Sequence, residues 1–251
     1  MTIFYFTGTG NSLAAAKRFK GKLVSIPQVM KESKLVFKDE AIGIIFPLYC
    51  LNPPKMVREF LCKAKFHTKY LFAVATYGNL AGASMQKLQK SVGEYGYRFD
   101  YMNTLLMVDN FLPNFEINEE IALLPEKKTE ECLKQIAADI YERRHYVPKA
   151  TKRDTELSVM CEPLMAQQDK GENAREFSVN GNCIRCGICA KVCPADNITL
   201  AEQIKFHDKC ESCFACIHAC PENAVHLKNE KSNVRWRNPE VTLEELIQSN
   251  Q

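Results

Sequence analysis

Eight of the twelve cysteines in this 251-residue sequence follow one spacing pattern that occurs twice. Residues 183–194 read CIRCGICAKVCP and residues 210–221 read CESCFACIHACP, so Cys-x2-Cys-x2-Cys-x3-Cys-Pro recurs at an offset of 27 residues. Three thiolates spaced by three residues can fold around one corner of a cuboidal iron–sulfur cluster, and the fourth is carried away by the following turn to ligate the other cluster. The repeat therefore predicts two 4Fe–4S clusters. Because no ligand is missing, it favours electron transfer over an open catalytic iron.

The same rule divides the eight cysteines into two sets of ligands. The first cluster takes Cys183, Cys186, Cys189 and Cys220, and the second takes Cys210, Cys213, Cys216 and Cys193. Two zinc sites are the alternative, because zinc also binds four thiolates. Zinc modules usually present two separated pairs of ligands, so the regular triplets followed by Cys-Pro favour iron–sulfur clusters. The other cysteines, which we interpret as free thiols, are Cys50, Cys62, Cys132 and Cys161.

A second stretch that could do chemistry is the loop TGTGNS, residues 7–12. It lies between a short apolar run and a helical pattern. Backbone N–H groups, three hydroxyl groups and two glycines that allow close approach would together suit a monophosphate. The loop is not a nucleoside triphosphate loop, because no lysine follows the glycines. It is not the dinucleotide fingerprint either, which would need glycine at the position of Leu13.

Two later loops strengthen the phosphate interpretation. Residues 46–54, FPLYCLNPP, and residues 75–84, ATYGNLAGAS, each follow a predicted strand, and they carry Tyr49 and Tyr77. A phosphate site beside two tyrosine-bearing loops suits flavin mononucleotide (FMN), whose ring can stack on an aromatic side chain. The candidate FMN-binding residues are Thr7, Gly8, Thr9, Gly10, Asn11, Ser12, Tyr49, Thr76, Tyr77, Gly78 and Asn79.

The elements that position these loops are expected in residues 1–146, where apolar runs alternate with helical patterns. The predicted strands are residues 3–6, 23–26, 41–46, 70–76 and 105–108, and the predicted helices are residues 13–20, 54–63, 83–93 and 129–144. This alternation predicts an α/β fold with a doubly wound parallel sheet. Ligands of such sheets bind beyond the carboxyl ends of the strands, where the three loops lie.

Changes in composition divide the chain into four parts. Residues 1–146 hold the alternating pattern, residues 147–173 are a polar connector, residues 174–230 carry the cysteine repeat, and residues 231–251 form a tail. Within the connector, one helix is expected around residues 155–165. The cysteine repeat predicts a small second domain of the bacterial two-cluster ferredoxin type.

These motifs together resemble a known family. The three loops look like the phosphate, first ring and second ring loops of flavodoxins, and the chain resembles fusions of a flavodoxin-like domain with a two-cluster ferredoxin, sometimes called ferrodoxins. The tail NVRWRNPEVTLEELI is similar to the basic-aromatic stretch after the second cluster in that family. The resemblance implies a flavodoxin-like sheet with the phosphate at residues 7–12. It also implies that Tyr49 and Tyr77 flank the ring and that Gly78 and Asn79 approach its polar edge.

Three functions are compatible with these motifs. The first is an electron-transfer protein that passes single electrons between two 4Fe–4S clusters and bound FMN, since a cluster carries one electron and a flavin holds one or two. The second is a flavin-dependent reductase of a small substrate. The third is a docking module whose first domain has lost its flavin. An open flavin edge would indicate a carrier, whereas a loop closed over the ring would indicate an enzyme. We favour the carrier. A carrier requires redox partner proteins.

No side chain is identified from the sequence as an acid–base catalyst. The five histidines are isolated, and we interpret them as surface or hydrogen-bonded core residues. His218 lies between Cys216 and Cys220 and could tune the potential of the second cluster through its charge. Asp109 and Asn110 follow the fifth predicted strand and are candidates for contact with the flavin side chain.

Composition excludes several other classes of protein. The longest apolar stretch, residues 41–51, is interrupted by Gly43 and Pro47 and is shorter than the roughly 20 residues of a membrane-spanning helix. Lysines and arginines are scattered and form no basic block, so nucleic acid is not an expected partner. The N-terminus lacks the basic region and cleavage site of a signal peptide, so we expect a cytoplasmic protein with reduced thiols.

Overall fold

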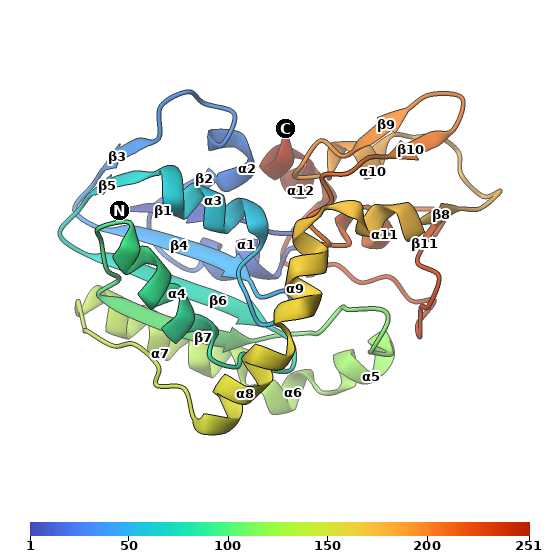
Figure 1. Ribbon diagram of the computed structural model, residues 1–251. Helices are drawn as coiled ribbons and strands as arrows, with labels where there is room; N and C mark the ends of the chain where they lie inside the picture. The colour runs from blue at the N-terminus through green and yellow to red at the C-terminus, as the bar shows by residue number, and fades with distance from the viewer.

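A five-stranded parallel sheet forms the first part of the chain in the computed structural model, which describes residues 1–251 (Figure 1). Its strands are β1 (Thr2–Tyr5), β2 (Lys22–Ser25), β4 (Ile42–Pro47), β6 (Leu71–Tyr77) and β7 (Tyr101–Leu106). They lie in the order β2-β1-β4-β6-β7, and all neighbouring pairs are parallel. Counted along the chain this order is 2-1-3-4-5, the flavodoxin-like arrangement. The predicted α/β fold class is confirmed.

The last strand of the sheet differs from its prediction. The first four strands lie within one residue of their expected positions, but β7 begins at Tyr101, whereas a strand was expected at residues 105–108. Asn103 and Thr104 interrupt the apolar run in the sequence. They are tolerated because β7 is an edge strand, in which both side chains are only half-buried.

Helices cover both faces of the sheet. The four predicted helices form as α1 (Asn11–Lys17), α3 (Lys55–Lys63), α4 (Ser84–Glu94) and α7 (Thr129–Tyr141). Because successive strand side chains point to opposite faces, Ile3 and Tyr5 pack with α1 and α7, whereas Phe4 and Phe6 pack with α3 and α4. None of the helices in the structure combines the length and the hydrophobicity that crossing a lipid bilayer requires.

Several short elements were not expected from the sequence. They are α2 (Ile26–Val29), β3 (Val36–Lys38), β5 (Lys65–His67), α5 (Ile117–Ala122) and α6 (Leu124–Lys127). β3 and β5 form a parallel pair, and their residues Phe37 and Phe66 pack against Phe60 of α3. Segments of this length contain too few residues for a periodic pattern, which explains why the sequence did not reveal them.

The connector forms two helices where one was expected. They are α8 (Lys152–Met160) and α9 (Glu162–Asp169), followed by a 3₁₀ helix, η1 (Glu172–Glu176). Thr151 and Asp154 form a capping box that starts α8. Pro163 stands in the first turn of α9 and cannot continue the hydrogen-bond ladder of α8, so the helix breaks there. Figure 1 shows α8 and α9 leading from the sheet towards the C-terminal part.

The cysteine repeat folds into two copies of one structural unit. Its elements are β8 (Ser178–Val179), α10 (Ile188–Lys191), β9 (Ile198–Leu200), β10 (Ile204–Phe206), α11 (Ala215–His218) and β11 (Val225–His226). α10 and α11 begin 27 residues apart, as do β9 and β11, which matches the offset of the cysteine motifs. β9 pairs with β10 and β8 with β11, both antiparallel. Ile198, Phe214 and Ile217 contribute to a separate buried core.

The tail returns to the sheet domain and contacts both parts of the chain. Its helix, α12 (Leu243–Asn250), lies between the sheet and the cysteine repeat (Figure 1). The hydroxyl groups of Tyr5 and Ser249 are 2.9 Å apart in a buried hydrogen bond, and the Asn250 amide donates to the Val192 oxygen at the end of α10 (2.9 Å). The tail thus links the two parts through polar contacts.

An apolar interface also joins the two parts. Val192, Ala215 and Ala219 of the cysteine repeat belong to the same buried cluster as Leu13 and Ala16 of α1. Domains joined by a polar interface tend to move relative to each other, whereas a continuous apolar contact resists such motion. The cysteine repeat is therefore held in one position against the carboxyl edge of the sheet.

Candidate cofactor sites

The three loops expected to bind a cofactor meet at the carboxyl edge of the sheet, around a cavity of about 570 Å³. Ten of the eleven candidate residues line it: Thr7, Gly8, Thr9, Asn11, Ser12, Tyr49, Thr76, Tyr77, Gly78 and Asn79. Asp109 and Asn110 line it as well. Gly10 is the exception, because it faces Asn238 and Val241 of the tail. The loops after β1 and β4 flank the point where strand order reverses, which is where such sheets bind ligands.

The loop at residues 7–12 contains backbone donors without partners. Apart from Gly10, whose N–H donates to Thr7 Oγ1 (3.1 Å), residues 8–12 donate their backbone N–H groups to no acceptor in the protein. Most of the loop is buried, and buried N–H groups without acceptors are rare in folded proteins. Several such donors within one turn suit an anion with multiple oxygens. The donor set of this loop fits a phosphate group.

Two glycines of the cavity are also required by protein contacts. A Cβ atom on Gly8 would lie 2.6 Å from the backbone oxygen of Cys213, and one on Gly78 would overlap Asp109. The sequence attributed the glycines at residues 8 and 10 to close approach of a phosphate. The structure adds a second reason for Gly8, because another loop of the protein packs directly on it.

Tyr49 and Tyr77 lie on different walls of the cavity. The Tyr49 ring meets the Phe6 ring edge-on, with centroids 6.5 Å apart. Burial raises the pKa of Tyr49, and the charges of Cys213 and Glu211 raise it further, so Tyr49 lies against the second cysteine motif. Burial raises the pKa of Tyr77, and the nearby Thr104 side chain of β7 lowers it. Both tyrosines are therefore held by protein contacts at the cavity wall.

A third aromatic wall was not identified from the sequence. The rings of Phe111 and Phe214 are stacked, with centroids 5.6 Å apart and planes at 15°, and Phe177 lies 6.1 Å from Phe214. All three line the cavity. They come from three distant segments, so only the folded chain brings them together.

The connector closes one side of the cavity. The residues it contributes are Cys161, Leu164, Gln167, Gln168 and Asn173, and Glu176 and Phe177 line the cavity directly after it. Cys50 and Cys161 also line the cavity as free thiols, whereas Cys62 and Cys132 are exposed at the surface. The connector therefore forms part of the cavity wall.

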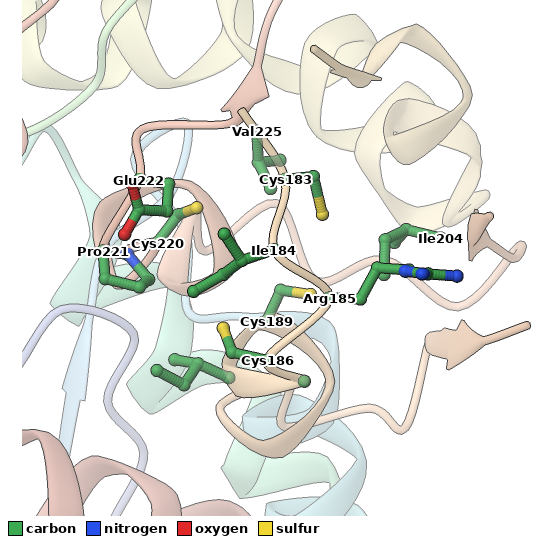
Figure 2. Close-up of a pocket in the computed structure, with 12 residues that line it drawn as sticks. Cys183, Ile184, Arg185, Cys186, Cys189, Ile204, Cys220, Pro221, Glu222 and Val225 are labelled. Atoms are coloured by element: carbon green, nitrogen blue, oxygen red, sulfur yellow. The ribbon is translucent and has the colours of Figure 1, made fainter. Parts of the chain in front are cut away.

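The first set of cysteines lines a separate, smaller cavity. Cys183, Cys186, Cys189 and Cys220 all line it, and Figure 2 shows their sulfur atoms around a common space. Four thiols around one space are the ligand set that a cuboidal iron–sulfur cluster takes.

The second set of cysteines lies deeper in the protein. Burial raises the pKa of Cys216, and the thiolate charges of Cys213, Cys193 and Cys210 raise it further, which shows that the four are neighbours. Equivalent backbone donors reach the fourth cysteine of each motif. Asn197 N donates to Cys193 Sγ (3.3 Å) and Ala224 N donates to Cys220 Sγ (3.2 Å). Hydrogen bonds to ligand sulfurs influence the reduction potential of a cluster.

The second set of cysteines lies between the first set and the large cavity. Cys213 of the second set lines the large cavity directly. Cys189 of the first set is among the neighbours whose charge raises the pKa of Cys216. The first set lies at the surface, where Cys186 is exposed and 63% of Ile184 is exposed.

His218 is a hydrogen-bonded core residue. Its Nε2 lies 2.9 Å from the Asn110 oxygen, which can only accept, and its Nδ1 accepts from Trp236 N (3.2 Å). Both partners require the neutral ring, and burial lowers the pKa of His218 to about 4. The expectation that His218 tunes the second cluster through its charge is therefore wrong, and the core interpretation holds.

Comparison with known proteins identifies the C-terminal part. Residues 138–239 match the family model of the 4Fe-4S dicluster domain, a stretch that includes both cysteine motifs. The match supports an iron–sulfur electron-transfer function for this part of the chain. Together with the sheet order, it shows that the chain joins a flavodoxin-like α/β domain to a C-terminal 4Fe–4S domain of the ferredoxin type. No curated protein matches the sequence.

Two solved structures show partial similarity to the chain. Rubredoxin oxygen:oxidoreductase from Desulfovibrio gigas is 17% identical over 55% of this chain, with a TM-score of 0.32. A metal-soaked flavodiiron core from Synechocystis is 13% identical over 56% of this chain, with a TM-score of 0.29. In both comparisons this chain covers 36% of the length of the other protein.

Proposed function

We propose that the protein binds one FMN and two 4Fe–4S clusters and passes single electrons between them. One observation carries the proposal: Cys213, a ligand expected of the second cluster, lines the same cavity as the loop at residues 7–12. A flavin in that cavity and a cluster on the second set would therefore both adjoin Cys213. Short separations of this kind are what electron transfer between cofactors requires.

The residues of the large cavity would hold FMN in three ways. Unpaired backbone N–H groups of Gly8, Thr9, Asn11 and Ser12 would bind the phosphate. Tyr49 and Tyr77 would flank the ring, and Gly78 and Asn79 would approach its polar edge. When bound, FMN supplies the conversion between one-electron and two-electron chemistry that clusters alone lack.

The order of the sites defines a path along which electrons would pass. The first cluster, on Cys183, Cys186, Cys189 and Cys220, would lie at the surface beside the exposed Ile184. The second cluster, on Cys210, Cys213, Cys216 and Cys193, would lie between it and the cavity. A redox partner protein would therefore exchange electrons at the first cluster. Twelve unpaired cysteines suit a reducing compartment such as the cytoplasm.

A second candidate function is a flavin-dependent reductase of a small molecule. The observation in its favour is the connector, because Leu164, Gln167 and Gln168 of α9 line one wall of the cavity. The cavity volume of about 570 Å³ falls within the usual size range of small-molecule sites. Electrons from the surface cluster would then serve a reaction in this cavity.

The test is an anaerobic measurement of iron, sulfide and FMN in reconstituted protein. We expect about eight irons and one FMN per chain. Cys186→Ser should remove the first cluster and Cys210→Ser the second, each with loss of about half of the iron. Cys132→Ser, on an exposed free thiol, is the matched control and should change nothing.

Each other outcome identifies an alternative. Eight irons without flavin would leave a ferredoxin-type docking module on a sheet domain that no longer binds FMN. Stoichiometric zinc and no sulfide would indicate two tetrathiolate zinc sites. Electron transfer itself is followed by rapid reduction of the clusters, which should be succeeded by reduction of FMN within the same molecule, independent of protein concentration.

A further inference from the structure

A buried ion pair lies beneath the loop that carries Gly78. Lys127 Nζ is 2.6 Å from Glu120 Oε2, and only 7% of each side chain is exposed. Lys127 also donates to the backbone oxygens of Gly78 (3.0 Å) and Met107 (2.8 Å), so all three of its protons are used. Removing two charges from water costs several kcal/mol for each ion and is offset only when hydrogen bonds satisfy both groups. A buried pair with all of its hydrogen bonds satisfied holds the backbone around it in a fixed position.

The ion pair fixes the position of Asp109, which lines the large cavity. The Asp109 backbone N–H donates to Glu120 Oε2 (2.9 Å), and Asp109 Oδ1 accepts from Phe111 N (3.0 Å). The Asp109 side chain also packs on Gly78, where no side chain would fit. Asp109 is therefore fixed beside the loop that is expected to face the polar edge of the ring.

The surroundings of Asp109 favour its protonation. The pKa of Asp109 is raised to about 6, chiefly by burial; the Phe111 N–H and Lys127 lower it, and the charge of Glu120 raises it. These two charged side chains, from α5 and α6, are the ones that face it. Among the residues that line the cavity, Glu176 is the other acid, and no lysine or arginine lines it. A carboxyl group with a pKa near the working pH can bind and release a proton readily.

We propose that Asp109 couples proton uptake to electron uptake in this cavity, an inference that rests on the proposed function. Two electrons delivered to bound FMN, one from each cluster, add negative charge to the cavity. Negative charge nearby disfavours an ionised carboxylate. The Asp109 carboxylate therefore binds one proton from solvent, so that an O–H bond forms on Asp109 while the clusters are oxidised and FMN is reduced.

The same proton would serve the reductase candidate. A small acceptor reduced in the cavity needs protons as well as electrons, and Asp109 would supply one of them. Its O–H bond breaks, the proton passes to the product, and the carboxylate returns to its starting state. The electrons are replaced through the surface cluster by a redox partner protein.

The experiment measures the midpoint potential of bound FMN in the holoprotein at pH values on both sides of 6. Wild type is compared with Asp109→Asn, which keeps the acceptor for Phe111 N. Above pH 6, the wild-type potential should fall more steeply with pH, because reduction takes up a proton at Asp109. The variant should have the higher potential there, since asparagine adds no negative charge, and the two curves should converge below pH 6.

Two further variants complete the test. Asp100→Asn is the matched control, because Asp100 lies before β7 at the opposite edge of the sheet, where its Oδ2 accepts from Leu71 N (2.8 Å); its curve should follow wild type. Glu120→Gln removes the charge that favours protonated Asp109, so the steep range should move to lower pH. This variant tests the proposal even where Asp109→Asn does not fold.

The outcomes separate this inference from the proposed function. Identical curves for wild type and Asp109→Asn, in protein that binds FMN and both clusters, would overturn only the role of Asp109. Protein that retains no FMN would overturn both. A steep range that is present in wild type, absent from Asp109→Asn and displaced in Glu120→Gln would establish the coupling.

Discussion

The backbone oxygen of Cys213 occupies the space that a side chain on Gly8 would need: a Cβ atom there would lie 2.6 Å away. The phosphate-type loop after β1 and the second cysteine motif are 205 positions apart in the sequence, yet they are in direct contact. This contact joins the flavodoxin-like domain to the ferredoxin-type domain at the point where the proposed cofactors would meet.

Gly8→Ala should weaken this contact. The added methyl group must displace the backbone of the cysteine motif, and overpacking of this kind costs typically about 1–3 kcal/mol. Denaturant unfolding should show the loss, accompanied by faster release of FMN from the holoprotein. Gly181→Ala is the control, because a Cβ atom there meets nothing within 4 Å. Equal stability of the two variants would contradict the close packing of Gly8.

Lys127→Met should destabilise the fold strongly. The substitution leaves the Glu120 carboxylate buried without its cation and frees the oxygens of Gly78 and Met107, and breaking a buried pair costs about 3–5 kcal/mol. Thermal unfolding should show the loss at neutral pH. Lys134→Met, at an exposed position of α7, should be close to neutral.

A double variant separates the ion pair from packing. Combining Lys127→Met with Glu120→Leu removes both charges, so it should recover part of the stability lost in the single variant. If the double variant were less stable than Lys127→Met alone, the pair would not be the source of the loss.

Asp109 should make stability depend on pH in a defined direction. Its pKa in the folded protein, about 6, is above its ordinary value of 3.8, so the folded state favours the protonated form. That contribution is fully present below 3.8 and is lost as the pH rises through about 6. Asp109→Asn, which is never ionised, should therefore be more stable than wild type above pH 6, by at most about 3 kcal/mol.

The check is a comparison of unfolding free energies at several pH values. The difference between Asp109→Asn and wild type should shrink as the pH falls from 6 towards 4. A difference that stays constant across this range would show that the carboxyl group is not held in a protonated state by the fold.

The two clusters should differ in their resistance to oxidation. Cys186 is exposed in the first set, whereas no cysteine of the second set is exposed and Cys216 is buried. Treatment with an oxidant and an iron chelator should therefore release about half of the iron in a fast phase and the rest slowly. Cys186→Ser should lack the fast phase. Release of all iron in a single phase from wild type would contradict this difference in exposure.

Features with local patterns could be predicted from the sequence. The ligand sets follow from spacing within two short motifs, and the structure places Cys183 and Cys220, 37 positions apart, in one cavity. The loops at residues 7–12 and 46–54 follow buried strands, and parallel strands necessarily bring such loops to one edge. Local spacing and strand alternation were therefore sufficient to predict most of the architecture.

Features that depend on contacts between distant segments could not be predicted. Lys127 stands in the run LPEKK, where a lysine is ordinarily solvated, and only the fold buries it beside Glu120. Phe111 and Phe177 have neighbours in sequence that suggest loops, yet both line the large cavity with Phe214. The two helices of the connector were predicted as one, and the contribution of α9 to the cavity wall has no signature in the residues of that helix.

The tail has a consequence for how the protein is made. Asn238 donates its backbone N–H to the Thr9 oxygen, and the Ser249 hydroxyl bonds to that of Tyr5. The first strand and its loop are synthesised early, whereas these two partners are in the tail and are synthesised late. Until then a nascent chain has the sheet and its loops but lacks this cover. The contacts that the tail makes with the first strand and its loop therefore form last during synthesis of this chain, after the sheet domain and the cysteine repeat are complete.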